Sequence, residues 1–150
     1  MNFLAVFIGG GLGSIARYAI ALIINKLGYH YVWATMLANV LACFIIGLLT
    51  AVVLKGNLSE QQRLLFATGF CGGFSTFSTF SNETWGLFHS GQFVMAFVNI
   101  FLSLTLCLAA TFVGLKAGYW YMILWQFSPF ILRGANARQK EKDFKTNEAS

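Results

Sequence analysis

The chain has 150 residues, of which 57% are hydrophobic, 17% are aromatic and only 10% are charged. Soluble domains carry about 25% charged residues, so this composition excludes an ordinary soluble domain and suits one membrane-embedded unit. The formal net charge is +5, but five of the ten Lys and Arg residues and three of the five acidic residues lie within residues 133–150. The preceding residues offer no basic stripe to lie along phosphates, and a nucleic acid is not expected as a partner.

Four stretches are long and apolar enough to cross about 30 Å of hydrocarbon, which takes roughly 20 helical residues. They cover residues 3–25, 33–54, 62–89 and 92–117. The first lacks a basic leader and carries Arg17, so a retained span is expected rather than a cleaved signal peptide. The links are short, and Ser59, with Gln62 three residues later, is expected to cap the third helix. The tight turn at Ser90-Gly91 predicts that the third and fourth spans are antiparallel neighbours.

After the fourth span, residues 119–132 are apolar but only 14 long, with several Trp and Tyr side chains and Pro129 near the end. That length is short for a span, and Trp and Tyr favour the membrane interface. The expected organisation is a four-helix membrane domain over residues 1–118, followed by an interfacial segment or an extension of the fourth helix over 119–132. A charged, disordered tail is expected over 133–150.

Four glycines in the first span, Gly9, Gly10, Gly11 and Gly13, superficially suggest a dinucleotide-binding loop. They lack the full spacing, a preceding strand and a downstream acid near the expected offset. Gly9 and Gly13 instead fit the small-xxx-small pattern that lets helix backbones approach closely. Helix packing is therefore the preferred interpretation.

The three cysteines, Cys43, Cys71 and Cys107, lie in apolar surroundings at wide spacing. No pair has the spacing of a metal-ligand or redox motif. Free cysteine packs as a small hydrophobe, so all three are expected to be buried structural residues.

Three strongly polar side chains lie inside the expected spans. Arg17 is about 14 residues into the first helix, roughly 21 Å along it at 1.5 Å per residue. It either snorkels to the interface or supplies a fixed positive charge that attracts anions into a vestibule. Asn39 in the second span either holds helices together or lines a pathway. Glu83, the only acid in the third span, lies either at a wet end or deeper with a hydrogen-bond partner, as a candidate functional group.

Residues 72–80 read Gly-Gly-Phe-Ser-Thr-Phe-Ser-Thr-Phe inside the third span. Adjacent glycines weaken a helix, and a broken backbone in hydrocarbon is tolerated where protein buries it or where it lines a water-filled path. A break at Gly72-Gly73 would free backbone carbonyls, which suit a hard cation such as sodium. The segment is therefore the expected working part of the molecule.

If the helix resumes after Ser75, Phe77 and Phe80 share one face of it. Aromatic rings have positive edges, and two rings presented edge-on would partly stabilise an anion. Ser78 and Thr79 would donate hydroxyl hydrogens to the same anion. The alternative is ordinary aromatic packing beside helix-bonded hydroxyl groups.

Residues 69–83, Gly-Phe-Cys-Gly-Gly-Phe-Ser-Thr-Phe-Ser-Thr-Phe-Ser-Asn-Glu, closely resemble the Fluc/CrcB family of fluoride channels. Residues 5–18, Ala-Val-Phe-Ile-Gly-Gly-Gly-Leu-Gly-Ser-Ile-Ala-Arg-Tyr, resemble the first helix of that family. Leu-Ala-Asn at 37–39, followed by Ile-Ile-Gly at 45–47, resembles its second helix. The likeness runs in order over about residues 3–118.

The resemblance implies an all-α membrane protein with four transmembrane helices per subunit, a broken third helix and an antiparallel dual-topology dimer with two fluoride pores. It also implies a structural sodium ion at the dimer interface, bound by the backbone carbonyls of Gly72 and Ser75. The pore phenylalanines of the family correspond to Phe77 and Phe80. The other pore groups of the family correspond to Asn39, Ser78, Thr79 and Glu83.

The expected function is a passive, highly selective fluoride channel of a bacterial cytoplasmic membrane, and not an enzyme. An open path driven by the membrane potential would export fluoride from the cytoplasm. A homodimer is preferred, although the five basic tail residues would favour one orientation and thus an oppositely inserted homologous partner. The alternatives are a small proton-coupled exporter, which needs a titratable carboxylate deep in a helix, and a non-transporting packing protein.

Overall fold

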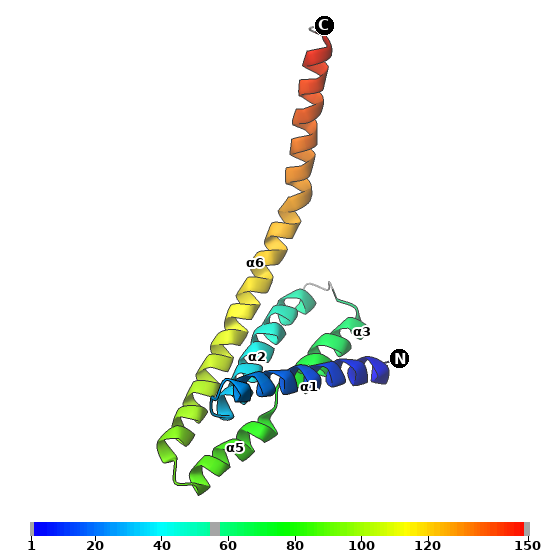
Figure 1. Ribbon diagram of the computed structural model, residues 1–150. Coiled ribbons are helices and arrows are strands. Elements are labelled where there is room, and N and C mark those ends of the chain that lie inside the picture. Colours follow the sequence, from blue (N-terminus) through cyan, green and yellow to red (C-terminus); the bar gives the residue numbers. More distant parts are fainter. Residues whose placement is uncertain (1, 55–57, 149–150) are drawn as a thin grey trace. The chain divides into compact units, whose positions relative to one another are not determined.

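The computed structural model describes residues 2–54 and 58–148, with side chains through Tyr121 and at Ile123. Every element in these ranges is a helix, which confirms the predicted all-helical class. The elements, traced in Figure 1, are α1 (Asn2–Lys26), α2 (Val32–Leu54), α3 (Glu60–Arg63), the π-helix η1 (Leu64–Cys71), α4 (Gly72–Phe74), α5 (Phe77–His89) and α6 (Phe93–Glu148).

Three of the described helical stretches are long and apolar enough to cross a membrane, namely Asn2–Lys26, Val32–Leu54 and Phe93–Tyr121. They agree with the first, second and fourth predicted spans. Large apolar side chains lie exposed along them, such as Phe7 at 77% and Leu108 at 69%, as expected for surfaces that face lipid. The chain is therefore a multi-pass membrane protein. The predicted third span is divided among α3, η1, α4 and α5, the longest of which has 13 residues.

The helical run from Glu60 to His89 begins at a capping box and is interrupted once. The Ser59 hydroxyl accepts from the Gln62 amide at 3.3 Å, and the Gln62 side chain accepts from the Ser59 amide at 3.0 Å, which confirms the predicted cap. The interruption lies at Ser75 (φ −80°, ψ 156°) and Thr76 (φ −154°, ψ 113°), whose backbones are extended. Gly72 is helical (φ −65°, ψ −37°), so the sequence placed the break three residues too early.

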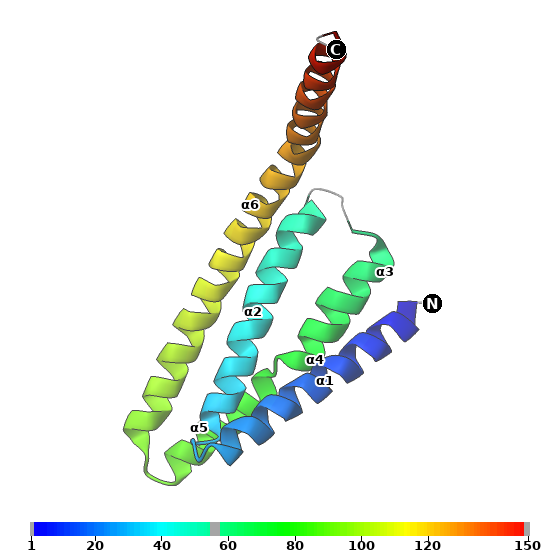
Figure 2. The ribbon, with the colours of Figure 1, turned by 45° about the horizontal axis from the view of Figure 1, so that its top comes forward.

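Glycines let α1 lie directly on η1 and α4, as Figure 2 shows. A Cβ atom at Gly9 would overlap the Leu65 carbonyl oxygen, and one at Gly13 would overlap the Phe70 carbonyl oxygen. This confirms the packing interpretation of the small-xxx-small pattern. Gly73 follows the same rule, because a Cβ there would overlap the carbonyl oxygen of Gly10. Close contact with α1 thus explains a glycine that would otherwise weaken α4.

α2 and the first part of α6 run side by side and in the same direction in both views (Figures 1 and 2). A Cβ atom at Gly47 would overlap the carbonyl oxygen of Thr111, and one at Gly114 would overlap that of Phe44. Backbone therefore meets backbone between these two helices. Such close approach is the usual role of small residues between membrane helices.

The chain divides into two compact units, Met1–Gly118 and Tyr119–Ser150. In the second unit the backbone of α6 continues to Glu148, through 119–132 and through the predicted disordered tail. The assignment of 119–132 as an interfacial segment or helix extension, and of 133–150 as a charged, disordered tail, stays a prediction. The site described below belongs entirely to the first unit.

Candidate functional site

A cavity of about 230 Å³ lies where α2, the interruption, α5 and α6 meet. Its lining combines amide, hydroxyl and thiol groups with two phenylalanine rings and contains no charged side chain. The lining residues are Asn39, Cys43, Ser75, Thr76, Phe77, Phe80, Ser103, Leu104 and Cys107.

Asn39 of α2 holds the interruption in place by bonding the backbone of Thr76 on both sides. The Thr76 amide donates to Asn39 Oδ1 at 2.8 Å, and Asn39 Nδ2 donates to the Thr76 carbonyl at 3.4 Å. In a continuous helix the Thr76 amide would donate to the carbonyl of Gly72, four residues earlier. Asn39 therefore takes a donor that a continuous helix would direct to Gly72.

The Ser75 carbonyl is freed in the same manner by the cap of α5. In a continuous helix it would accept from the amide of Thr79. That amide donates instead to the Thr76 hydroxyl, at 3.2 Å, because Thr76 is the N-cap of α5. The carbonyl oxygens of Gly72 and Ser75 are thus among those that lose their regular helical donors at the interruption.

Hydroxyl groups gather around Thr76 at the N-terminal end of α5. The Thr76 hydroxyl donates to Thr79 Oγ1 at 3.0 Å and lies 3.2 Å from Ser78 Oγ. The first turn of a helix also carries a partial positive charge. The start of α5 is therefore a polar, weakly electropositive end, and its first residue, Phe77, lines the cavity.

Phe77 and Phe80 lie one turn apart on α5 and both face the cavity. Their ring centroids are 5.7 Å apart and the ring planes are inclined at 41°. Phe77 is 79% exposed in the single chain, whereas Phe80 is half-buried. The two rings are therefore accessible to a ligand in the cavity, because neither is buried in the hydrophobic core.

Glu83 lies one turn further along α5, outside the cavity lining. Its Oε1 accepts from the buried hydroxyl of Thr35 at 2.7 Å. Its Oε2 is buried and has no hydrogen-bond partner among the described residues. Glu83 thus has the deeper, hydrogen-bonded position that was one of its two predicted settings, with one oxygen left over.

A buried hydrogen-bonded chain runs from α5 into the cavity wall. Asn99 Nδ2 donates to Thr84 Oγ1 at 2.9 Å, and Ser103 Oγ donates to Asn99 Oδ1 at 3.3 Å. Ser103 lines the cavity.

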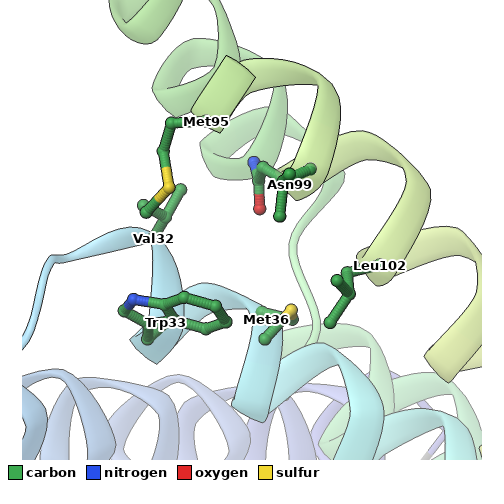
Figure 3. Close-up of a pocket in the computed structure, with 7 residues that line it drawn as sticks. Val32, Trp33, Met36, Met95, Asn99 and Leu102 are labelled. Carbon is green, nitrogen blue, oxygen red and sulfur yellow. The ribbon is translucent and has the colours of Figure 1, made fainter. Parts of the chain in front are cut away.

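Asn99 also borders a much smaller cavity of about 10 Å³ among the apolar side chains of Val32, Trp33, Met36, Met95 and Leu102 (Figure 3). That volume holds no more than about one water molecule, so the cavity of about 230 Å³, which gathers the polar groups and rings described above, is the candidate site.

The structure brings four of the predicted site residues, Asn39, Ser75, Phe77 and Phe80, into the cavity lining. Ser78 and Thr79 do not line the cavity, but each contacts the hydroxyl of Thr76, which does. Gly72 is exposed on the other side of the interruption, and Glu83 and Arg17 are half-buried outside the lining.

Sequence reasoning missed five lining residues. Thr76 carried a signal, since Thr is a preferred N-cap residue and a helix was expected to resume just after it. The other four, Cys43, Ser103, Leu104 and Cys107, carried none, because only helix packing shows that they line a cavity.

These features define a multi-pass helical membrane protein with a cavity at an interrupted helix, lined by aromatic rings together with a few polar groups. Residues 4–115 match the family model described as "CrcB-like protein, Camphor Resistance (CrcB)", and the chain belongs to this family.

The chain is also similar to curated relatives named "Fluoride-specific ion channel FluC". It is 42% identical to that of Desulfotalea psychrophila, over 82% of this chain and 96% of the relative. It is 42% identical to that of Serratia proteamaculans, over 79% of this chain and 94% of the relative. The protein of Thermus thermophilus is likewise 42% identical, over 78% of this chain and 94% of the relative. The family resemblance stated from the sequence is confirmed.

Proposed function

We propose that the chain is a passive, fluoride-specific ion channel that lets fluoride leave the cytoplasm, and that the cavity at the interruption is part of its pore. The relatives carry the name of a fluoride channel, and a channel is not an enzyme. The observation that carries the proposal is the convergence of Asn39, Phe77 and Phe80 on one cavity that has no charged lining.

This lining suits a small anion that must bind and leave again. The ring edges of Phe77 and Phe80 carry partial positive charge, and the start of α5 adds the electropositive end of a helix. Hydroxyl and amide hydrogens replace part of the anion's hydration shell, with Asn39, Ser78 and Thr79 as the proposed donors. Because no full positive charge lies in the lining, the anion is not held tightly, and flow requires sites that it can leave.

Glu83 and Arg17 are proposed to act at the ends of the path. The unpartnered Glu83 Oε2 is placed to accept from a hydrated or protonated species near Thr35. Arg17 supplies a positive charge that attracts anions towards the membrane protein.

We further propose a structural sodium ion bound by the carbonyl oxygens of Gly72 and Ser75. Hard cations prefer oxygen ligands, and these are the two carbonyls whose helical donors are diverted to Asn39 and Thr76. Gly72 is exposed, and a Cβ atom there would have nothing within 4 Å, so its surroundings are open to a second chain. When bound, sodium supplies positive charge that joins carbonyl groups from two chains.

The proposed assembly is an antiparallel dual-topology homodimer in a bacterial cytoplasmic membrane, with residues 60–89 as a broken third span. Two copies would bring four carbonyl oxygens to the shared sodium ion. An oppositely inserted homologous subunit is the alternative partner, because five basic residues within 133–150 favour a cytoplasmic tail.

Fluoride efflux from liposomes that hold the purified protein tests the function. Efflux of fluoride is expected to exceed that of chloride by a large factor, and to proceed without a pH gradient. Large chloride flux would exclude a fluoride-specific channel. Obligatory coupling to protons would favour the second candidate, a proton-coupled exporter, for which the half-buried Glu83 carboxylate is the available proton carrier.

A further inference from the structure

Two cysteines that are remote in sequence line the same cavity. Cys43 belongs to α2 and Cys107 to α6, and both line the 230 Å³ space. Cys43 lies one helical turn before Gly47, and Cys107 lies one helical turn before Thr111. These two later positions are in backbone contact, because a Cβ atom at Gly47 would overlap the Thr111 carbonyl oxygen. α2 and α6 run in the same direction (Figure 2), so the one-turn step leads to facing positions on both helices.

Both cysteines are free and half-buried, so neither sulfur is committed to a disulfide or sealed in the core. The third cysteine, Cys71, is fully buried and does not line the cavity. The expectation that all three cysteines are buried structural residues is therefore confirmed only for Cys71.

We propose that the thiol pair of Cys43 and Cys107 binds one thiophilic metal ion, such as monovalent copper or silver, and that the bound ion closes the cavity to anions. Thiolate ligands select soft metal ions. Binding forms two metal–sulfur bonds and releases two protons from the thiols to solvent, with no change of oxidation state.

The coordination number narrows the choice of metal. Among the described residues, no group of three or more His, Cys, Asp or Glu side chains converges to hold a metal ion. A structural zinc site needs four such ligands, whereas monovalent copper and silver accept two thiolates in a line. The pair therefore suits a two-coordinate ion.

The charge of the complex explains why it would close the path. One monovalent cation with two thiolates carries a net charge of −1, and it lies in the cavity lined by Phe77 and Phe80. A fixed negative charge beside an apolar wall, to which Leu104 contributes, repels an entering anion more strongly than it would in water. Block by the ion rests on the proposed channel function, whereas binding of the ion does not.

Silver nitrate in chloride-free buffer is the probe, because silver precipitates with chloride. Equilibrium dialysis of the full-length protein in detergent measures silver binding, and fluoride efflux from liposomes measures block. The variants are Cys43→Ser and Cys107→Ser, with Cys71→Ser as the matched control, and each must elute as the wild-type assembly does. Cys43→Ala and Cys107→Ala serve as replacements if a hydroxyl disturbs packing.

Wild type and Cys71→Ser are expected to bind one silver ion per thiol pair and to be blocked by it. Cys43→Ser and Cys107→Ser are each expected to need at least about tenfold more silver for half-maximal binding and for half-maximal block of fluoride efflux. Equal silver affinity in Cys43→Ser and wild type would overturn the site. If silver binding depends on Cys43 and Cys107 but fluoride efflux stays unchanged, the bound ion does not close the cavity. Absence of fluoride efflux in silver-free wild type would count against the proposed function, and the dialysis result would still decide the site.

Discussion

Replacing Asn39 by alanine removes both hydrogen bonds that hold the interruption between α4 and α5 open. The bond from the Thr76 amide to Asn39 Oδ1 is short, at 2.8 Å, and the return bond from Nδ2 is longer, at 3.4 Å. The side chain also belongs to the lining of the cavity. One substitution therefore changes the backbone at the interruption and the donor set of the proposed pore together.

The stability lost in Asn39→Ala depends on whether the Thr76 amide finds another acceptor. If it stays without a partner in its half-buried position, the folded state loses about 1–3 kcal/mol. If it swings back to donate to the Gly72 carbonyl, less stability is lost, but that oxygen is withdrawn from the proposed sodium site. Only the second outcome lowers the stabilisation by sodium. In either case the Asn39 donor is lost from the cavity, and fluoride flux is expected to fall by at least about tenfold, or 1.4 kcal/mol in the barrier.

The assay is the thermal midpoint of the detergent-solubilised protein in sodium and in N-methylglucamine buffers, combined with fluoride efflux from liposomes. Asn39→Asp keeps the acceptor for the Thr76 amide but places negative charge in the cavity, so it is expected to retain more stability than Asn39→Ala and still lose flux. Asn82→Ala, at an exposed position of α5, is the control and should match wild type. Wild-type midpoint, sodium response and flux in Asn39→Ala would refute this account of the interruption.

Four further results are expected. Phe80→Ile should suppress fluoride efflux while the assembly keeps its mass by light scattering, and wild-type flux would remove Phe80 from the pore. Gly13→Ala should destabilise the protein by about 1–3 kcal/mol through overlap with the Phe70 carbonyl, whereas Gly11→Ala, with nothing within 4 Å, should not lower the thermal midpoint. Removal of sodium should lower the wild-type thermal midpoint. If the starting sodium concentration is 100-fold above the dissociation constant, the lost stabilisation is about 2.7 kcal/mol. An unchanged midpoint would exclude a structural sodium ion. Glu83→Gln should lower fluoride flux but leave the remaining flux independent of a pH gradient if the protein is a channel, whereas loss of all fluoride transport, in a protein whose wild type couples it to protons, would support the exporter.

Much of the fold follows from local sequence. The lengths of α1, α2 and the membrane-crossing part of α6 were readable because a helix must keep apolar side chains towards hydrocarbon over about 20 residues. The capping box at Ser59 and Gln62 was equally readable, since it needs only two side chains three residues apart. Gly9 and Gly13 marked a packing face by their spacing alone.

The position of the interruption could not be read in this manner. Glycine has low helix propensity, so the sequence favoured a break at Gly72-Gly73. In the structure a contact with α1 holds Gly73 in α4, and the hydrogen bonds of Asn39 on α2 place the extended residues at Ser75 and Thr76. Tertiary contacts from two other helices thus outweigh a local preference of about 1 kcal/mol.

The sequence by itself determined the class of protein, the family, and the residue types available to an anion and a cation. Spacing along one chain was enough for these, because helical periodicity and family motifs are local properties. Only the tertiary structure decided that Asn39, Phe77 and Phe80 share a cavity and that Cys43 and Cys107 line the same cavity. The residues concerned lie on three different helices, and their meeting depends on close backbone approach at Gly47 and Gly114, which no property of a single helix specifies.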